Sequence, residues 1–360
     1  MRIGILGGGQ LGRMIALAGV PLDLSFRVLD PSRAACAAAV AEHQVGEYED
    51  YAALAEFVAG LDAVTYEFEN VPVETARWLS LRLPVYPPPE ALEVAHDRYA
   101  EKLFFRRIGI PVPPYRAVTT RPDYDEAIRE IGLPAVLKTR RFGYDGKGQT
   151  VLRTDGDIEP AWTLLGGRPL ILEQFVRFDR EVSLLGVRGR AGEQAFYPLV
   201  ENHHRDGILD RSIAPAPHPG SLQSVAERHV GAALNALAYT GVLAIEFFVV
   251  GETLFANEMA PRVHNSGHWT IEGAVTSQFE NHLRAVLGWP LGDASERCCA
   301  AMINLIGRLP ARESVLAFPG AHLHLYGKAP RPGRKLGHVT LLADNHDRLA
   351  ELLQRWPSRS

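Results

Sequence analysis

The chain has 360 residues, 46% of them hydrophobic, which is enough for two or three packed units and too long for one simple domain. Its formal net charge of −4, with 22% charged residues, gives no general signal for nucleic acid or a membrane surface, so any basic site must be local. The three cysteines, Cys36, Cys298 and Cys299, lack metal-ligand spacing and form an odd count, which argues against a disulfide framework and favours a reducing cytoplasm.

Residues 1–90 are predicted to form repeated strand–helix units. The expected elements are a strand at 2–6, a glycine turn opening a helix to about 19, a strand at 25–29, a helix at 34–40 and a strand at 63–66. Strands that alternate with helices imply a parallel sheet with helices on both faces. The proline-rich stretch 83–89 cannot continue a helix or a central strand, so it marks a boundary.

The rest of the chain mixes helices with strand-like runs. The expected elements are a helix at 92–108 and strands at 135–138, 150–152, 170–172, 182–187, 242–250 and 254–258. The most apolar run, 242–250, contains Glu246 and is too short to span a bilayer. After about residue 290 the chain becomes rich in proline, glycine and arginine and ends in a helix near 348–356. The pattern indicates an α/β protein.

A first glycine-rich turn, Gly7-Gly8-Gly9-Gln10-Leu11-Gly12, follows the first strand and opens a helix. With Asp30 at the end of the second strand, it nearly completes the fingerprint of a dinucleotide-binding fold, in which glycines let an anion approach the helix N-terminus. The same turn can instead hold a substrate phosphate or pack against a sheet edge. The pattern alone therefore leaves a dinucleotide-dependent dehydrogenase open.

A second glycine-rich loop follows the strand that ends in Lys138. Gly143, Gly146 and Gly148 lie in this loop together with Lys147, and extended structure resumes at residue 150. A hairpin of this kind can fold over a polyphosphate, with backbone N–H groups and the two lysines meeting its charge. It is not a Walker A loop, which would open a helix. The alternative is an ordinary flexible hairpin tip.

Two acidic residues are predicted to face each other across a hairpin. If the turn 251–253 places Val250 opposite Leu254, then Glu246 lies opposite Glu258. Two carboxylates across a strand pair repel each other, and a divalent cation bridging them to phosphate oxygens would offset that repulsion. The alternative is a solvated sheet face. Asn257 would point to the other face unless the strand twists or bulges.

These residues resemble the motifs of the 5-(carboxyamino)imidazole ribonucleotide synthases, a family within the ATP-grasp superfamily, and the resemblance covers nearly the whole chain. The most specific match is the run from Asn257 to Trp269. The other matching segments are residues 7–14, 142–149, 173–176, 326–328 and 331–338.

The resemblance implies a fold, a reaction and an assembly. The fold would be ATP-grasp, with a Rossmann-like N-terminal domain over 1–90, an ATP-grasp domain over 91–290 whose two lobes hinge near 168–176, and a small C-terminal domain over 291–360. The enzyme would use ATP, Mg²⁺ and bicarbonate to carboxylate 5-aminoimidazole ribonucleotide through carboxyphosphate, in purine biosynthesis. It would be a cytoplasmic homodimer, with small molecules and neither nucleic acid nor membrane as partners.

The resemblance also implies roles for individual residues. The catalytic residues would be Arg262, Lys138, Tyr144 and Asp145. ATP would contact Arg98, Lys138, Gly143, Tyr144, Asp145, Gly146, Lys147, Gly148, Gln149, Glu173, Gln174, Phe175, Val176, Glu181, His204, Asn257 and Glu258. The ribonucleotide and bicarbonate would contact Gly8, Gln10, Leu11, Glu67, Arg262, His264, Asn265, Ser266, Lys328, Arg331, Arg334 and Lys335. Glu246 and Glu258 would hold the metal ion.

Some of these roles also have a physical argument. The planar guanidinium of Arg262 suits both bicarbonate and a phosphoryl group. The segment 328–335 is a local basic cluster in an acidic chain and would bind the ribonucleotide 5′-phosphate, unless it is only a basic surface tail. Glu67 is the favoured aminoimidazole-binding acid, with Glu69 left open.

Lysine is scarce in this chain, with five residues against 33 arginines among the 38 basic residues. Four of the five lysines fall in the motifs above, which fits sites that need a compact ammonium group. Three alternatives stay open at this point. They are another ATP-grasp ligase, of the biotin-carboxylase or formate-dependent type; a dinucleotide-dependent dehydrogenase; and a non-catalytic nucleotide sensor.

Overall fold

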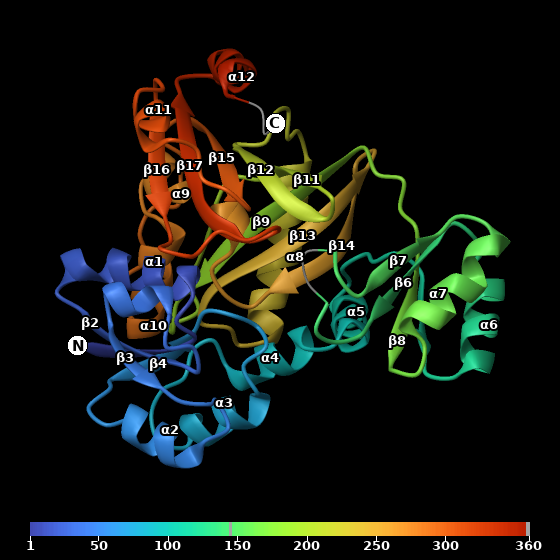
Figure 1. Cartoon of the computed structure of the whole chain (residues 1–360), viewed down its shortest axis with the longest axis horizontal. Coiled ribbons are helices and arrows are strands. Elements are labelled where there is room, and N and C mark those ends of the chain that lie inside the picture. Colours follow the sequence, from blue (N-terminus) through green and yellow to red (C-terminus); the bar gives the residue numbers. More distant parts are fainter. Residues whose placement is uncertain (144–145, 358–360) are drawn as a thin grey trace.

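The computed structural model describes residues 1–143 and 146–357, and within these residues the strands form three sheets. Figure 1 shows the N-terminal sheet (blue) and a small antiparallel sheet (green) on opposite sides of a large sheet that runs between them. Tyr144 and Asp145, two of the predicted site residues, lie outside the described residues. None of the helices in the described part of the chain is long and apolar enough to cross a membrane.

The N-terminal sheet is parallel, with strand order β3-β2-β1-β4. Its strands are β1 (Arg2–Leu6), β2 (Ser25–Asp30), β3 (Glu42–Val45) and β4 (Ala63–Tyr66). Its helices are α1 (Gln10–Gly19), α2 (Tyr51–Phe57) and α3 (Val73–Ser80), with short 3₁₀ turns η1 (Val20–Leu22) and η2 (Cys36–Ala39). One face of the sheet packs against α1 and the other against α2 and α3, which confirms the predicted parallel sheet with helices on both faces.

The predicted helix at 34–40 is wrong, because only the 3₁₀ turn η2 forms there. The segment has an alanine run with high helix propensity, but η2 is short and Gly8 accepts a backbone hydrogen bond from Ala37. Its role is to pack beside the glycine turn. The predicted single helix at 92–108 is also wrong, since α4 (Pro89–Ala95) and α5 (Arg98–Arg107) are separate. The Asp97 side chain accepts hydrogen bonds from the first backbone N–H groups of α5 and so starts a new helix.

The small sheet is antiparallel, with strand order β5-β8-β6-β7. Its strands are β5 (Tyr115–Val118), β6 (Ala135–Thr139), β7 (Gln149–Leu152) and β8 (Leu170–Gln174), and it is covered by α6 (Arg121–Ile131), η3 (Asp155–Asp157) and α7 (Ile158–Leu165). The predicted strand–loop–strand arrangement around the second glycine-rich loop is confirmed by the pairing of β6 with β7. The chain leaves this sheet after β8, at the segment where a hinge is predicted.

The large sheet has nine strands in the order β14-β13-β9-β11-β12-β15-β17-β16, with β10 paired to β9. The strands are β9 (Arg180–Arg188), β10 (Gln194–Phe196), β11 (Val200–Arg205), β12 (Ile208–Ala214), β13 (Gly241–Val250), β14 (Thr253–Ala260), β15 (Cys299–Ile306), β16 (Ala321–Leu325) and β17 (Lys335–Ala343). Its accompanying helices are α8 (Leu222–Ala236), η4 (Asn265–Gly267), α9 (Thr270–Gly273), α10 (Gln278–Leu287), α11 (Arg312–Leu316) and α12 (His346–Arg355). Since β12 pairs with β15, the C-terminal strands continue this same sheet.

Candidate active site

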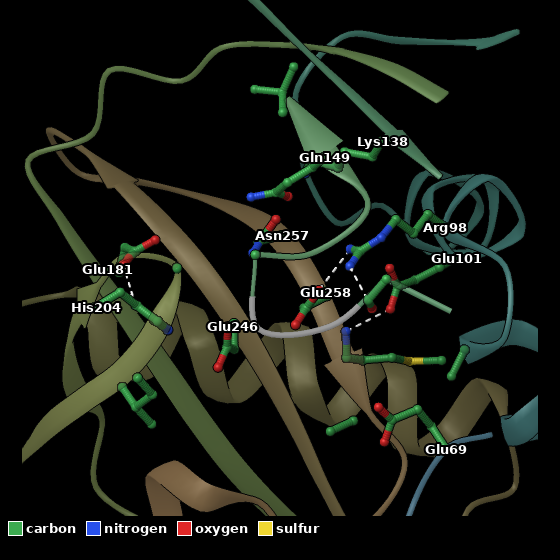
Figure 2. A pocket seen from close by; sticks show the side chains of 18 of the residues that line it. Glu69, Arg98, Glu101, Lys138, Gln149, Glu181, His204, Glu246, Asn257 and Glu258 are labelled. Atoms are coloured by element: carbon green, nitrogen blue, oxygen red, sulfur yellow. Dashed lines mark hydrogen bonds and ion pairs between the residues drawn. The ribbon is translucent and has the colours of Figure 1, made fainter. Parts of the chain in front are cut away.

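A cavity of about 400 Å³ is lined by residues of α1, of the segment after β4, of α5, and of the small and large sheets. It brings together 20 of the predicted site residues: Gln10, Leu11, Arg98, Lys138, Gly143, Gly146, Gln149, Glu173, Gln174, Phe175, Val176, Glu181, His204, Glu246, Asn257, Glu258, Arg262, His264, Asn265 and Lys335. The predicted site residues that lie elsewhere in the described structure are Gly8, Glu67, Lys147, Gly148, Ser266, Lys328, Arg331 and Arg334. Figure 2 shows ten labelled residues of this cavity.

The hairpin of β13 and β14 turns one residue earlier than predicted. Val250 pairs with Thr253, so the expected pairing of Val250 with Leu254 is wrong, and the turn has two residues, Gly251 and Glu252. Gly251 has a φ of +58°, the left-handed conformation that a two-residue hairpin turn favours.

A β-bulge then restores the predicted facing of the two acidic residues. Phe247 pairs with Ala256, whereas Glu246 pairs with Glu258, so Asn257 is the extra residue of the bulge. The bulge turns Asn257 into the cavity, and its Oδ1 is buried without a hydrogen-bond partner among the described residues. Figure 2 shows all three side chains around the same part of the cavity.

The two facing carboxylates differ in charge environment. Arg98 donates to Glu258 at 2.8 Å, and although burial alone would raise the pKa of Glu258, Arg98 holds it at about 2. Burial, followed by the charge of Glu258, raises the pKa of Glu246 to about 7. A cation bound between the two carboxylates would lower the pKa of Glu246, and so would oppose the effects of burial and of the Glu258 charge. Within the described residues no group of three or more His, Cys, Asp or Glu side chains could hold a metal ion, so Mg²⁺ here would need phosphate oxygens as well.

Lys138 at the end of β6 provides a cation at the opposite wall of the cavity. Its ammonium donates to Glu173 Oε2 at 3.0 Å, and Glu173 is buried. Burial would raise the pKa of Glu173, but the charges of Lys102 and Lys138 outweigh it and hold this pKa at about 2. Glu173 Oε1 is buried without a hydrogen-bond partner among the described residues, so this acceptor remains unsatisfied beside the cavity.

Two backbone donors of the hinge segment are already used within the fold. The N–H of Gln174 donates to Pro114 O at 2.8 Å, and that of Phe175 to Pro134 O at 3.1 Å, so neither is available to an adenine edge. Sequence reasoning also missed an aromatic pair beside the hinge. Phe178 and Phe248 stack with ring centroids 4.9 Å apart and both line the cavity.

Glu181 and His204 form a polar pair on neighbouring strands, β9 and β11. Their atoms Oε2 and Nδ1 are 2.6 Å apart, and Figure 2 shows the pair at the far wall from Arg98. Burial lowers the pKa of His204, but the nearby carboxylates outweigh it and raise this pKa overall. The pair supplies hydrogen-bonding groups on the same side as Phe248.

Arg262 is paired with Glu69, the acid that the sequence left open as an alternative to Glu67 for binding the aminoimidazole. Nε and a terminal nitrogen of Arg262 both contact Glu69 Oε2, and the two residues line the cavity together. Glu69 follows β4, so this ion pair joins the N-terminal sheet to the end of β14. Beside it, burial lowers the pKa of His264 to about 3, so this imidazole is neutral at pH 7.

Glu67 instead occupies the first glycine turn. Its carboxylate accepts hydrogen bonds from the backbone N–H groups of Gly9 and Gly12, and Gly8 N donates to Asp30 at 2.7 Å. A Cβ on Gly9 would lie 2.3 Å from Glu67 Oε1, so a larger residue there would displace the Glu67 carboxylate. The turn therefore receives an internal carboxylate where a dinucleotide fold would receive a pyrophosphate.

The basic cluster divides around the cavity. Lys335 lines it, and Lys328 contacts the Gln10 side chain, which also lines it. Arg331 and Arg334 are in the exposed loop between β16 and β17, where Arg334 donates to Ala329 O. Ser266 is turned away and accepts a hydrogen bond from Ser183 Oγ in the core.

Helix α5 holds β14 through three side chains, two of which sequence reasoning missed. Arg98 binds Glu258, Glu101 accepts from Met259 N at 2.7 Å, and Lys102 donates to the backbone carbonyl of Asn257 at 2.7 Å. Lys102 is the one lysine of the five that lies outside the motifs. Since lysine is so scarce in this chain, its presence there was the one indication in the sequence that this position needs a lysine.

Comparison with known proteins identifies the family. The family model of the ATP-grasp domain matches residues 103–279, that of the ribonucleotide synthetase preATP-grasp domain matches 1–96, and that of the phosphoribosylaminoimidazole carboxylase C-terminal domain matches 300–352. The N5-carboxyaminoimidazole ribonucleotide synthase of Pseudomonas aeruginosa is 55% identical, and the match covers 95% of this chain and 94% of that protein. The chain belongs to the N5-carboxyaminoimidazole ribonucleotide synthase family.

Solved structures of this synthase family extend the comparison to three dimensions. The N5-carboxyaminoimidazole ribonucleotide synthetase of Thermus thermophilus matches with a TM-score of 0.95 and 61% identity, covering 99% of each chain. The Aspergillus clavatus synthase, solved in complex with ADP and 5-aminoimidazole ribonucleotide, matches with a TM-score of 0.92 and 30% identity, covering 98% of this chain and 96% of that one. The fold is therefore the expected ATP-grasp fold with a preATP-grasp domain and a C-terminal domain of the family's own type.

Proposed function

We propose that the chain carboxylates 5-aminoimidazole ribonucleotide with bicarbonate at the expense of ATP, as a ligase of purine biosynthesis. One observation carries the proposal. A single cavity joins a lysine and a carboxylate pair suited to a triphosphate to a partly buried arginine suited to bicarbonate, and it continues towards the basic C-terminal segment. The family's synthases, one of them solved with ADP and this ribonucleotide, support it.

ATP would lie between the small and large sheets. The pair of Phe178 and Phe248 offers a flat apolar wall for adenine. Glu181 and His204 suit the ribose hydroxyls. Arg98, Lys138 and the loop from Gly143 to Gln149 would then meet the phosphates with opposite charge and backbone N–H groups.

Glu246 and Glu258 would hold Mg²⁺ with phosphate oxygens completing its shell, and Asn257 Oδ1 is placed to assist. The residues fit the ion because two carboxylates that face each other across a strand pair repel each other unless a cation lies between them. When bound, the ion would polarise the γ-phosphate and offset its charge.

Arg262 would orient bicarbonate for attack on the γ-phosphorus. The bicarbonate oxygen forms a bond to that phosphorus as the bond to ADP breaks, which yields carboxyphosphate. The exocyclic amine of the ribonucleotide then attacks the carboxyl carbon, phosphate leaves, and the amine loses a proton. The glycine-rich loop, together with Tyr144 and Asp145, would keep water from this labile species.

The ribonucleotide would lie between the N-terminal sheet and the C-terminal strands. Gln10, Leu11 and Lys335 line this end of the cavity, and Lys328 is held against Gln10. Arg331 and Arg334 are in the loop above it and would reach the 5′-phosphate by side-chain movement. His264 and Asn265 add neutral hydrogen-bonding groups.

One contact pattern and one domain match disfavour two of the alternatives left open by the sequence. A dinucleotide-dependent dehydrogenase needs the N–H groups of the first glycine turn, and these bind Glu67 and Asp30. An ATP-grasp ligase of another kind would share the phosphate end of the cavity. It would lack the phosphoribosylaminoimidazole carboxylase C-terminal domain, which matches residues 300–352 here.

The assembly and compartment are part of the proposal. We expect a homodimer, which light scattering after gel filtration would test against a monomer mass of 39.6 kDa. Cys36, Cys298 and Cys299 are free thiols, which supports a reducing compartment such as the cytoplasm.

Phosphate release tests the function. In bicarbonate buffer with Mg²⁺ and ATP, we expect 5-aminoimidazole ribonucleotide to stimulate phosphate release at least about 10-fold over the basal rate, because its amine consumes carboxyphosphate productively. Hydrolysis that is indifferent to the ribonucleotide, or stimulated only by another acceptor, would displace the assignment.

Replacing Lys328 with alanine separates the two ends of the cavity. We expect the KM for the ribonucleotide to rise about 10- to 100-fold, the range for one lost charge-assisted hydrogen bond, while the KM for ATP stays within about twofold. Arg312→Ala, on exposed α11 of the same domain, is the matched control. An increase confined to the KM for ATP would show that the ribonucleotide end has been misplaced.

A further inference from the structure

Lys102 is a fully buried cation that the proposed chemistry does not use. It lies on α5, and its ammonium donates to the backbone carbonyls of Ala256 at 3.0 Å and Asn257 at 2.7 Å. It does not line the cavity, so it cannot reach a ligand there without leaving both carbonyls. A buried charge is costly unless it is paired, so its partner indicates its role.

That partner is Glu173, which Lys102 shares with Lys138. Glu173 Oε2 is 3.0 Å from the ammonium of Lys138 and 3.6 Å from that of Lys102. Two ammonium groups thus share one carboxylate oxygen, and Glu101 on the same helix also lies close enough to Lys102 for their charges to interact. The two lysines differ in their surroundings, because Lys102 donates to two backbone carbonyls inside the fold whereas Lys138 lines the cavity.

We propose that Lys102 is a positioning residue that serves as the permanent counter-charge of Glu173, so that Lys138 can move from Glu173 to a nucleotide phosphate. Without Lys102, a move of Lys138 would leave a buried carboxylate with no cation, and Lys138 would be held on Glu173 instead. The inference rests on the proposed assignment of Lys138 to ATP and extends it by naming the residue that releases this lysine.

The test measures ADP binding to the full chain by calorimetry, with steady-state kinetics beside it. We expect Lys102→Met to weaken ADP binding about 10-fold or more and to raise the KM for ATP similarly, with a smaller change in kcat. Glu173→Gln in the same chain should restore ADP affinity to within about threefold of wild type, because Lys138 then has no carboxylate to leave and the amide oxygen still accepts a hydrogen bond. Arg107→Met, on the exposed side of α5, is the control and should change neither quantity.

A purely structural role for Lys102 gives a different result. In that case the double variant would bind ADP no better than Lys102→Met, and this outcome overturns the inference, as would unchanged binding by Lys102→Met. Should Lys102→Met fail to fold, Lys102→Gln carries the test, because its amide can still donate to a backbone carbonyl but has no charge. The inference then expects ADP binding about 10-fold weaker than wild type, and wild-type affinity contradicts it. Absence of ADP binding by the wild-type chain would overturn the ATP assignment together with this inference, whereas equal binding by all variants overturns the inference alone.

Discussion

Replacing Glu258 with glutamine is expected to lower kcat by about a thousandfold or more while leaving the fold intact. Glu258 is the one carboxylate of the facing pair held ionised by Arg98, so it is the anion most available to a divalent cation. Without the metal ion, the transition state for phosphoryl transfer loses several kcal/mol of stabilisation, and the resulting rise in activation free energy corresponds to about this factor. The measurement is ribonucleotide-dependent phosphate release at saturating substrates.

Two further measurements separate the metal role of Glu258 from a structural one. Mg²⁺ should strengthen ADP binding to the wild-type chain and not to Glu258→Gln, whereas metal-free ADP binding should be similar in both. Glu252→Gln, at the exposed turn of the same hairpin, is the matched control and should keep full activity. Full activity in Glu258→Gln would remove the metal role.

The elements that the sequence predicted well are those with a strong local signal. The parallel strands of the N-terminal sheet and the hairpin around the second glycine loop follow from apolar runs bounded by glycine and proline. The failures also have local causes. The Asp97 cap divides an otherwise continuous helical pattern, and η2 packs an alanine run that propensity alone would make an α-helix.

The facing of Glu246 and Glu258 was predicted correctly from an incorrect register. The turn is one residue shorter than expected, and the bulge at Asn257 compensates by one residue. A one-residue slip moves every side chain of a strand to the other face, so only the bulge keeps Glu258 on the side of Glu246. Nothing in the local sequence specifies the bulge, since the contacts that hold it, from Lys102, come from a helix more than 150 residues earlier.

The choice between Glu67 and Glu69 shows where single-sequence reasoning ends. Both follow the same strand two residues apart, and strand periodicity places them on the same side. Their difference arises from distant partners, because Glu67 meets the glycine turn of α1 and Glu69 meets Arg262 after β14. The partners of Glu67 and Glu69 depend on how the sheets pack against each other, and the residue pattern of neither segment predicts that packing.

Replacing Arg262 with methionine is expected to lower kcat/KM for bicarbonate by about a thousandfold, the range found when an arginine that stabilises a transferring phosphoryl group is lost. ADP affinity should be nearly unchanged, because Lys138 and Arg98 remain. Lysine at this position should recover only part of the activity, since an ammonium lacks the planar fork that meets two oxyanion oxygens. The measurement is steady-state phosphate release with bicarbonate varied in degassed buffer.

Glu69 makes the Arg262 prediction specific. Its carboxylate is an oxyanion like bicarbonate, and it contacts the Arg262 guanidinium in the structure, so it competes with bicarbonate for Arg262. Glu69→Gln should therefore lower the KM for bicarbonate, whereas Arg262→Met should raise it. Arg284→Met, which breaks an arginine–glutamate ion pair with Glu280 on α10, controls for the loss of a charged pair and should leave the KM for bicarbonate unchanged. If Arg262→Met keeps the wild-type KM and kcat for bicarbonate, Arg262 only joins the two domains, and the bicarbonate site must be sought among the other residues lining the cavity.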